Sequence, residues 1–480
     1  MNKKCQVFTP EDYVKELLDS IEYKHDLYGK KILENSCGDG NILVAIVQRY
    51  IDNCKEKGMS RTRIKNGLSR DIYGIEIDKE QQEKCIEKLN RVLYKNDIKP
   101  VEWKIYEKDF LKWDTELKFQ YIAGNPPYIT YSELDESNRI YAKENFNSCK
   151  KGKFDYCYAF IEKSLKQLDI DGKMSYLIPS SIFKTVFGKN LRNIMKEYIT
   201  EIKDYPLEKI FNGALVKSSI VVFDKQRKQE YLRYKEMSRQ EELNIPFAQL
   251  GDKWFFTNVG MSGKFQFGDY FRVSHVVATL LNKAYVLEDG NYIERDNGFI
   301  CRNAEDKKTI IEKDVVRDTD TPRTIRYEKK EKIIFPYKYD ENGIVHYSIE
   351  EFEERYPGAT EYLMSFRDEL DERKKDDKAL WFEYGRTQAL NGLNCSKLLM
   401  STVITNNVEV SKISQESIPY AGIYISVRDG NNKYSLDDAI SILRSNLFQQ
   451  YVKGVGIPIS GQSVRITSKD VENYRFEEDF

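Results

Sequence analysis

The first half of the sequence predicts an α/β fold built on a doubly wound, mostly parallel sheet. Short apolar stretches of strand character alternate, as far as Phe223, with longer stretches that carry apolar residues at helical spacing. This alternation places helices on both faces of the sheet. Polar motifs follow the expected strands, and ligands of such sheets bind beyond the carboxyl ends of the strands. Because 480 residues exceed one ordinary hydrophobic core, we expect a second domain after the sheet.

The first element expected is a helix, which is followed by six strands with helices between them. Thr9 is its expected N-cap and Pro10 its first residue, because a hydroxyl and then a proline favour a helix start. The strands are expected at 31–34, 72–77, 101–105, 121–123, 174–178 and 219–223. The helices between them are expected around 43–50, 86–93, 158–168 and 191–198.

The second half of the chain lacks this alternation. Residues 225–250 are highly charged and predict a linker, so we expect a first domain at 1–228 and a second at 229–480. Short strands and turns are expected in the second domain. Two longer helices are predicted there, one over 359–370 and one that starts at Ser435 and runs to Tyr451.

Composition excludes several classes of protein. The net charge is −1, so any basic surface for a nucleic acid must be local. The eight cysteines form no C-x-x-C pair and the three histidines are scattered, which argues against a zinc site or a disulfide scaffold. We find no apolar stretch of signal-peptide or membrane-span length and expect a cytoplasmic protein. Local basic groups are expected at the mouth of the cleft: Lys143, Lys150, Lys151, Lys153, Lys184, Lys189, Arg192 and Lys196.

Asn125-Pro126-Pro127-Tyr128 is the most informative motif. Two prolines end the pairing of the preceding strand, because proline lacks an N–H and forces extended geometry on the residue before it. The Asn125 side-chain oxygen and the Pro126 carbonyl can then accept hydrogen bonds from an amino group on a planar ring, while Tyr128 stacks on that ring. The motif alone is compatible with a plain proline turn, and the polar residues around it favour the functional interpretation.

A second group of residues predicts a site for an adenosyl ligand. The loop after the first strand contains Gly38 and Gly40 without the third glycine of a dinucleotide fingerprint. Glu76, at the end of the second strand, is placed to accept both ribose hydroxyls, and Ile77 to pack on the adenine. Asp109 can accept from the adenine amino group, with Phe110 stacked beside it.

These motifs, in this order, resemble the gamma-class adenine-N6 DNA methyltransferases, the TaqI-like methylases of type II restriction-modification systems. The resemblance covers the N-terminal half and more loosely the second half. It rests on the following segments: 6–10, the glycine loop, Glu76, 109–110, 125–128, 152–160, 171–173 with 178–180, Phe211 and Val216. The gamma order is recognised because the segment ending in Thr9-Pro10 precedes the glycine loop.

The resemblance implies a Rossmann-like methyltransferase sheet followed by an α+β DNA-recognition domain. It implies S-adenosyl-L-methionine as cofactor, bound by Thr9, Glu34, Ser36, Gly38, Glu76, Ile77, Asp109, Phe110, Asn125 and Pro127. It implies transfer of the methyl group to the N6 amino group of an adenine flipped out of double-stranded DNA, without a metal. The catalytic residues it implies are Asn125, Pro126, Tyr128 and Phe211. We further expect a monomer, a cognate restriction endonuclease as partner and no membrane association.

Three alternatives stay open at this point. The Asn-Pro-Pro-Tyr motif also suits protein glutamine and RNA methyltransferases, although these are shorter and leave the second half unexplained. A catalytically silent DNA-specificity subunit could keep the fold, although the intact Asn125 and Glu76 argue against it. A fused restriction nuclease is not expected, because the leading motif begins at Gln6.

Overall fold

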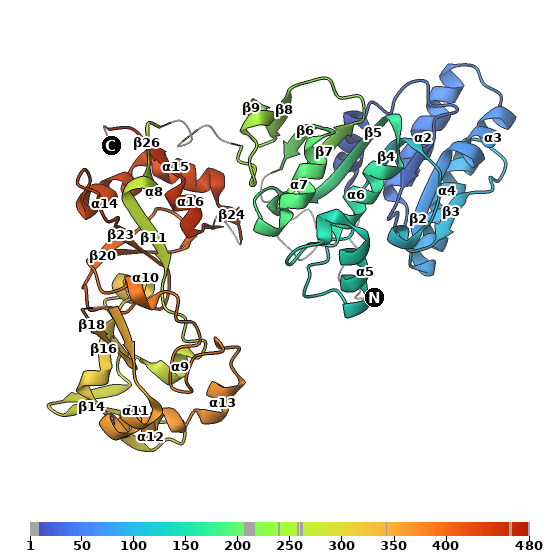
Figure 1. Ribbon diagram of the computed structural model, residues 1–480. Coiled ribbons are helices and arrows are strands. Elements are labelled where there is room, and N and C mark those ends of the chain that lie inside the picture. The colour runs from blue at the N-terminus through green and yellow to red at the C-terminus, as the bar shows by residue number, and fades with distance from the viewer. Residues whose placement is uncertain are drawn as a thin grey trace. The chain divides into compact units, whose positions relative to one another are not determined.

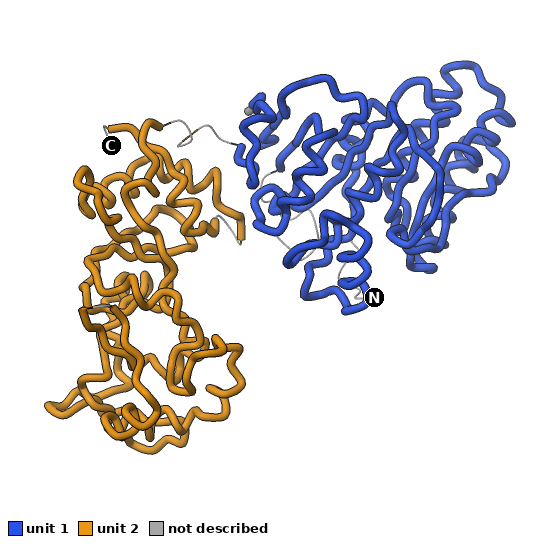
Figure 2. The backbone as a smooth tube through the Cα atoms, viewed as in Figure 1, with its two compact units in different colours: residues 1–256 blue, residues 257–480 orange. Residues whose placement is uncertain are grey.

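The chain folds into two compact units, residues 1–256 and 257–480 (Figure 2). The computed structural model describes residues 9–205, 217–238, 241–256, 259, 263–341, 343–459 and 463–478. The first unit contains the expected α/β sheet, and the second unit contains several small antiparallel sheets with helices (Figure 1).

The first unit is built on one nine-stranded sheet with the order β3-β2-β1-β4-β5-β7-β6-β8-β9. The first five strands pair in parallel, and β7 runs antiparallel to both of its neighbours. The order reverses between β1 and β4, which is where a doubly wound sheet opens a crevice at its carboxyl edge. The strands are β1 (Ile32–Glu34), β2 (Ile72–Glu76), β3 (Lys104–Glu107), β4 (Phe119–Gly124), β5 (Leu168–Pro179), β6 (Ile199–Asp204), β7 (Ser218–Asp224), β8 (Tyr231–Glu236) and β9 (Glu241–Pro246).

Helices cover both faces of this sheet, as the alternation in the sequence predicts (Figure 1). The helices of this unit are α1 (Glu11–Ser20), α2 (Asn41–Glu56), α3 (Arg61–Asp71), α4 (Lys79–Lys95), α5 (Glu136–Asn145), α6 (Cys157–Gln167) and α7 (Lys189–Lys196). Helices α1 to α4 pack in one core, and α6 and α7 pack in the other. Neighbouring strand residues alternate between these cores: Ile32 belongs to the first and Leu33 to the second.

The prediction of a linker at 225–250 is wrong. Strand β8 pairs with β6 and β9 pairs with β8, so the sheet continues past the expected boundary. Leu232, Tyr234 and Ile245 bury their side chains in the core of the first unit. The compact units consequently divide between residues 256 and 257, later than the expected 228/229.

The start of α1 also differs from the expectation. The helix begins at Glu11, its N-cap is Pro10, and no side chain caps it. The Thr9 hydroxyl instead accepts a hydrogen bond from Asn125 Nδ2 at 3.2 Å. A tertiary contact has therefore replaced the local cap. Helices α3 and α5 form between the expected elements and were not predicted.

The described residues of the second unit form six small antiparallel sheets. The four-stranded sheet contains β11 (Phe271–His275), β23 (Ile423–Val427), β20 (Lys397–Met400) and β22 (Val410–Ile413). One three-stranded sheet contains β12 (Val286–Leu287), β17 (Glu331–Ile334) and β16 (Val316–Thr319). Another contains β13 (Tyr292–Arg295), β14 (Gly298–Arg302) and β15 (Lys308–Glu312). A further one contains β21 (Val403–Ile404), β25 (Val464–Arg465) and β24 (Ile457–Pro458). The two-stranded sheets pair β10 (Phe265–Gln266) with β26 (Arg475–Phe476) and β18 (Tyr337–Asp340) with β19 (Gly343–His346).

Both long helices expected in this unit are interrupted. The segment expected as a helix over 359–370 forms two, and a new helix starts at Asn446 because the Ser445 hydroxyl accepts from Phe448 N and caps it. Ser435 caps the preceding helix, as predicted. The helices of the unit are α8 (Phe267–Tyr270), α9 (Asn282–Tyr285), α10 (Pro322–Arg326), α11 (Ile349–Arg355), α12 (Pro357–Met364), α13 (Arg367–Glu372), α14 (Leu436–Arg444), α15 (Asn446–Val455) and α16 (Ser468–Glu472).

Candidate active site

A pocket of about 410 Å³ opens at the carboxyl edge of the first unit's sheet. Its walls come from the segments that follow β1, β2, β3 and β4. These segments are distant in sequence, and the parallel pairing of the four strands brings them to one edge. The pocket therefore lies at the place where the order of the strands reverses.

All ten residues that the sequence assigned to cofactor binding line this pocket. They are Thr9, Glu34, Ser36, Gly38, Glu76, Ile77, Asp109, Phe110, Asn125 and Pro127. Of the four predicted catalytic residues, Asn125 is part of the lining. Pro126 is buried and Tyr128 is half-buried, and neither is part of the lining. Phe211 lies outside the described residues.

The glycine loop after β1 is shaped by two left-handed residues. Gly38 has φ of +50° and Gly40 has φ of +92°. A Cβ atom on Gly40 would come within 2.6 Å of Cys85 Sγ, so the loop packs tightly on α4. Cys37 N donates to Ile75 O at 2.9 Å and ties the loop to β2. Glycine is needed here for its backbone conformation and, at Gly40, for space.

Glu76 is fixed by three main-chain donors. Its Oε2 accepts from Gly38 N at 2.8 Å, and its Oε1 accepts from Ile77 N at 3.0 Å and Asp78 N at 2.9 Å. The carboxylate thus joins the glycine loop to the end of β2. Because each carboxylate oxygen can accept more than one hydrogen bond, Glu76 keeps capacity for hydroxyls of a ligand.

Glu34 and Asn35 place buried oxygen atoms beside the same pocket. Among the described residues, Glu34 Oε2 and Asn35 Oδ1 have no hydrogen-bond partner. Asn35 Nδ2 donates to Ser164 Oγ at 2.7 Å and to the Tyr176 hydroxyl, which fixes the amide. Burial raises the pKa of the Glu34 carboxyl well above its ordinary value, and neighbouring acidic groups, Glu76 among them, raise it further. Such unpaired acceptors suit a ligand that carries donors or positive charge.

Asn125 presents an unpaired acceptor at the end of β4. Its Nδ2 donates to Thr9 Oγ1 at 3.2 Å, and its main-chain oxygen accepts from Ser36 Oγ at 3.1 Å. These contacts orient the side chain. Its Oδ1 atom is buried and has no hydrogen-bond partner within the described part of the chain. A buried amide oxygen without a partner is costly in a folded protein, which makes it a candidate for contact with a substrate.

Tyr128 is anchored beside this motif by its hydroxyl, which donates to Leu177 O at 2.9 Å. Its ring packs against the core that contains α1 and α2. Burial raises the pKa of the Tyr128 hydroxyl well above its ordinary value. The phenol therefore stays neutral, and the hydrogen bond holds the ring in one orientation.

Three aromatic residues, Phe110, Tyr156 and Phe160, form a wall of the pocket. The Phe110 ring lies 5.3 Å from that of Phe160, and the Tyr156 ring lies 5.8 Å from Phe160, measured between centroids. Lys163 Nζ lies 5.3 Å from the Phe110 ring centroid and donates to Leu111 O at 2.9 Å. Burial lowers the pKa of the Lys163 ammonium to about 8. This wall suits a flat ring.

Sequence reasoning missed more than half of the lining. Tyr156 and Phe160 lie in the 152–160 segment, which was recognised without a role for either residue. The segment 129–138 adds Ile129, Glu133, Leu134, Asp135 and Asn138. No local pattern identifies these residues, because only the tertiary fold brings them to the pocket.

The expectation of basic residues at the cleft mouth is wrong for Arg192. The side chain of Arg192 is 1% exposed, its Nε donates to Asp252 O at 2.7 Å and its Nη1 donates to Ile182 O. Arg192 is therefore a structural residue. Lys196 Nζ donates to Leu250 O at 2.9 Å, and Lys150, Lys151, Lys153 and Lys189 are exposed.

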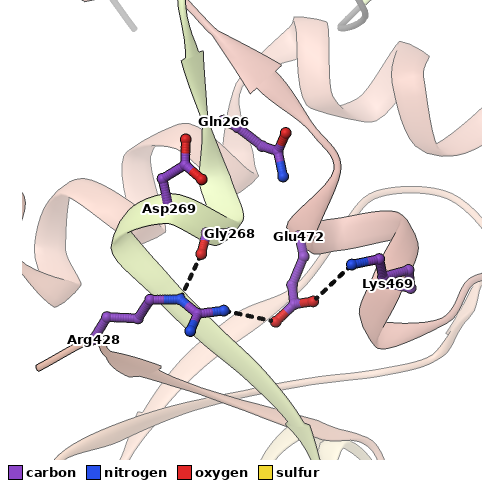
Figure 3. A pocket seen from close by; sticks show the side chains of 6 residues that line it. All are labelled: Gln266, Gly268, Asp269, Arg428, Lys469 and Glu472. Atoms are coloured by element: carbon purple, nitrogen blue, oxygen red, sulfur yellow. Dashed lines mark hydrogen bonds and ion pairs between the residues drawn. The ribbon is translucent and has the colours of Figure 1, made fainter.

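A second, shallow hollow lies in the second unit (Figure 3). Arg428 donates to Gly268 O and lies 3.4 Å from Glu472 Oε1, and Lys469 Nζ lies 3.8 Å from Glu472 Oε2. The charged groups that line it thus neutralise one another. This hollow links α8, β23 and α16 and offers no comparable set of unpaired acceptors.

Two further surveys of the described residues gave no site. No cluster of three or more His, Cys, Asp or Glu side chains is placed to hold a metal ion there. In the same residues, no helix combines the length and the apolar character required to cross a bilayer.

Comparison with known proteins finds a family that is similar to part of the first unit. The sequence profile of the family described as "Eco57I restriction-modification methylase" matches residues 27–211, which include the glycine loop, Glu76, Asp109 and the Asn-Pro-Pro-Tyr motif. This part of the chain is similar to the Eco57I family.

Relatives extend the Eco57I similarity to most of the chain. The Type II restriction enzyme and methyltransferase RM.Eco57I of Escherichia coli is 23% identical over 560 residues, which cover 95% of this chain and 55% of that protein. The Type II methyltransferase M.BstVI of Geobacillus stearothermophilus is 29% identical over 221 residues, which cover 42% of this chain and 39% of that protein. The chain thus spans about half the length of these relatives or less.

A solved structure supports the fold of both halves. The Type IIL restriction-modification enzyme MmeI, solved in complex with DNA, matches with a TM-score of 0.62 at 12% identity, over 96% of this chain and 63% of that chain. At this identity the match shows the fold alone.

Proposed function

We propose that this chain is a site-specific adenine-N6 DNA methyltransferase of a restriction-modification system. It transfers the methyl group of S-adenosylmethionine to the amino group of an adenine that has left the DNA duplex. The observation that carries this proposal is the buried and unpaired Asn125 Oδ1, which lines the same pocket as Glu76 and Asp109.

The pocket fits the proposed cofactor. The Glu76 carboxylate, held by three N–H donors, is placed to accept the ribose hydroxyls, and the aromatic wall at Phe110 to hold the adenine. The unpaired oxygens of Glu34 and Asn35 accept from the charged methionine end. When bound, the cofactor supplies a methyl group on a positively charged sulfonium.

Asn125 and Pro126 act on the target amino group. That nitrogen is a weak nucleophile, because its lone pair is delocalised into the adenine ring. The Asn125 Oδ1 atom and the Pro126 carbonyl accept hydrogen bonds from its two N–H groups, direct the lone pair toward the methyl group and stabilise the positive charge that develops. Thr9 and Ser36 position the Asn125 residue through their hydroxyls. No general base is required to start this displacement.

Tyr128 and Phe211 clamp the extruded adenine ring between them. The hydrogen bond from the Tyr128 hydroxyl to Leu177 O supports this role, because a fixed ring is a better stacking surface than a mobile one. Base–aromatic stacking is worth ~1–3 kcal/mol per base. The adenine must leave the helix because its amino group is paired and stacked inside the duplex.

The second unit is the proposed target-recognition domain. The assignment is supported by the separate core of this unit and by the fold shared with MmeI, which was solved with DNA. We propose that it reads base edges while the first unit performs the chemistry.

The test is methylation of plasmid DNA by the purified full-length chain with S-adenosylmethionine, followed by mass spectrometry of the nucleosides. We expect N6-methyladenine from the wild-type chain and none from the Asn125→Ala variant. The matched control is Asn90→Ala. Asn90 lies on α4, away from the pocket, and its exposed side-chain oxygen accepts a hydrogen bond from Trp103 Nε1. Methylated cytosine, protein or RNA in place of methyladenine would contradict the proposal.

A further inference from the structure

The loop that follows β5 exposes two apolar side chains. Val186 is 63% exposed and Phe187 is 45% exposed, and both lie in the short 3-10 helix η5 (Val186–Gly188). Exposure of apolar side chains to water is unfavourable in free energy, and neither residue has a role in the catalytic proposal. This apolar tip is the feature from which the inference starts.

The ring of Phe187 rests on the backbone of a second loop. A Cβ atom on Gly152 would fall 1.9 Å from Phe187 Cδ1, so only glycine fits beneath the ring. Gly152 has φ of +71°, which also favours glycine. A second link lies nearby, because Asn190 Nδ2 donates to Asn147 O at 3.1 Å. The two loops, 150–153 and 184–189, therefore form one surface, which we call the β5 knuckle.

The β5 knuckle is basic around its apolar tip. The two segments contain five lysines and no acidic residue: Lys150, Lys151, Lys153, Lys184 and Lys189. Lys150, Lys151 and Lys153 are exposed, and Lys189 forms an exposed ion pair with Asp252 at 2.7 Å. An apolar tip on loops rich in lysine is complementary to a polyanion that has an apolar interior, which describes duplex DNA.

The root of the knuckle is fixed. Thr185 Oγ1 and the Tyr158 hydroxyl lie within hydrogen-bond distance, at 3.0 Å. The buried Arg192 donates to Ile182 O at the start of the loop, and Trp254 N donates to Phe183 O at 2.8 Å. A loop that is fixed by these contacts keeps its side chains in place when a partner binds, whereas a mobile loop would be displaced. This also explains the burial of Arg192, which the sequence placed at the cleft mouth.

The knuckle lies on the same edge of the sheet as the catalytic motif. Strand β5 pairs in parallel with β4, and Gly124 lies opposite Tyr176 in the register. Asn125 thus follows the carboxyl end of β4. Strand β5 ends at Pro179, three residues beyond Tyr176, and the 184–189 loop of the knuckle comes after this end. Both therefore lie at the carboxyl edge of the sheet, where the pocket opens.

We propose that Phe187, supported by Val186, inserts into the base stack of duplex DNA beside the target adenine and stabilises its extruded state, while the surrounding lysines hold the phosphates. This inference rests on the proposed function and adds a residue that promotes extrusion. Apolar side chains that wedge between base steps partly unstack them, which lowers the cost of removing a neighbouring base.

The test compares paired and mismatched substrates. We expect Phe187→Ala to lower kcat/KM on a fully paired duplex by roughly 10-fold and by less than about 2-fold on a duplex with a mismatch at the target adenine, because a mismatched base is already loosened. The matched control is Ile170→Ala, which removes an 81% exposed side chain from the other end of β5. Lys151→Ala should weaken binding to both duplexes equally and reduce its salt dependence.

Fluorescence of 2-aminopurine at the target position gives an independent readout of unstacking. The wild-type chain with S-adenosylhomocysteine should raise this fluorescence, and Phe187→Ala should reduce the rise severalfold at saturating protein. An equal loss on paired and mismatched duplexes, or no loss on either, would overturn the wedge. A wild-type chain that methylates no DNA would instead overturn the proposed function, so the two failures are distinguishable.

Discussion

Replacement of Asn125 by alanine should lower the rate of methyl transfer strongly and leave stability almost unchanged. The substitution removes a buried Oδ1 atom that has no partner among the described residues, together with one hydrogen bond from Nδ2 to Thr9 Oγ1. At most buried polar residues a substitution lowers activity and stability together, because the side chain is hydrogen-bonded within the fold. At Asn125 we expect activity to fall without a matching loss of stability.

The effect on stability can be worked from the contacts. Loss of the unpaired acceptor relieves a desolvation cost of ~1–3 kcal/mol, whereas loss of the neutral hydrogen bond and the exposure of Thr9 Oγ1 as a new unpaired group cost a similar amount. The terms nearly cancel, so we expect the free energy of unfolding to change by less than about 1 kcal/mol. The exposed control, Asn90→Ala, loses one hydrogen bond from Trp103 and should cost ~1 kcal/mol.

The effect on catalysis should be large. Loss of one preorganised group that stabilises transition-state charge lowers kcat by about 10²–10³-fold in enzymes where this has been measured. Methyl transfer, urea unfolding and calorimetric binding of S-adenosylhomocysteine should be measured on the same preparation. A loss of more than about 2 kcal/mol in stability, or a fall in kcat of less than about 3-fold, would refute the reasoning.

Three further substitutions test other parts of the structure. Glu76→Ala should weaken binding of S-adenosylhomocysteine at least ~10-fold by calorimetry, because the carboxylate holds both the glycine loop and the proposed ribose contact. Burial raises the pKa of Asp155 to about 6, so stability should fall as pH rises from about 4 through about 6, and Asp155→Asn should remove this fall. In urea unfolding at pH 8 that variant should be ~1–2 kcal/mol more stable than the wild type, with no difference near pH 4. Lys397→Met should cost ~2–4 kcal/mol in the same assay, because the buried Lys397 Nζ donates to four main-chain carbonyls, two of them at 2.7 Å.

Sequence reasoning located β1, β2 and β4 because each is a short buried run that ends in a polar motif. It failed at the edge of the same sheet. Strand β9 forms the edge and β8 lies next to it. Both are rich in charge, and Leu232 and Tyr234 were too few to reveal the pattern of buried residues in β8. A charged segment and an edge strand have similar compositions, which is why 225–250 was interpreted as a linker.

Helix boundaries in the second unit show another limit. The apolar spacing across Ser445 is continuous enough to predict one helix from Ser435 to Tyr451. The structure restarts the helix at Asn446, and Leu447 is exposed. A serine inside an apolar pattern can act as a cap, and the sequence alone does not show that it does.

For the site, the residues that follow strand ends could be predicted and those from elsewhere could not. Glu34, Glu76 and Asn125 share an edge because parallel pairing requires it. Tyr156 and Glu133 enter the pocket from segments whose positions depend on tertiary packing. Thr9 shows both aspects: it lines the predicted site, yet its hydroxyl contacts Asn125 and does not cap the helix.

The most direct test of the central claim is base-resolved detection of modified DNA from cells that express either the wild-type chain or Asn125→Ala. The proposed adenine chemistry predicts N6-methyladenine at one short sequence context with the wild-type chain and unmodified DNA with the variant. Modified cytosine, or the same methyladenine pattern with both chains, would contradict it.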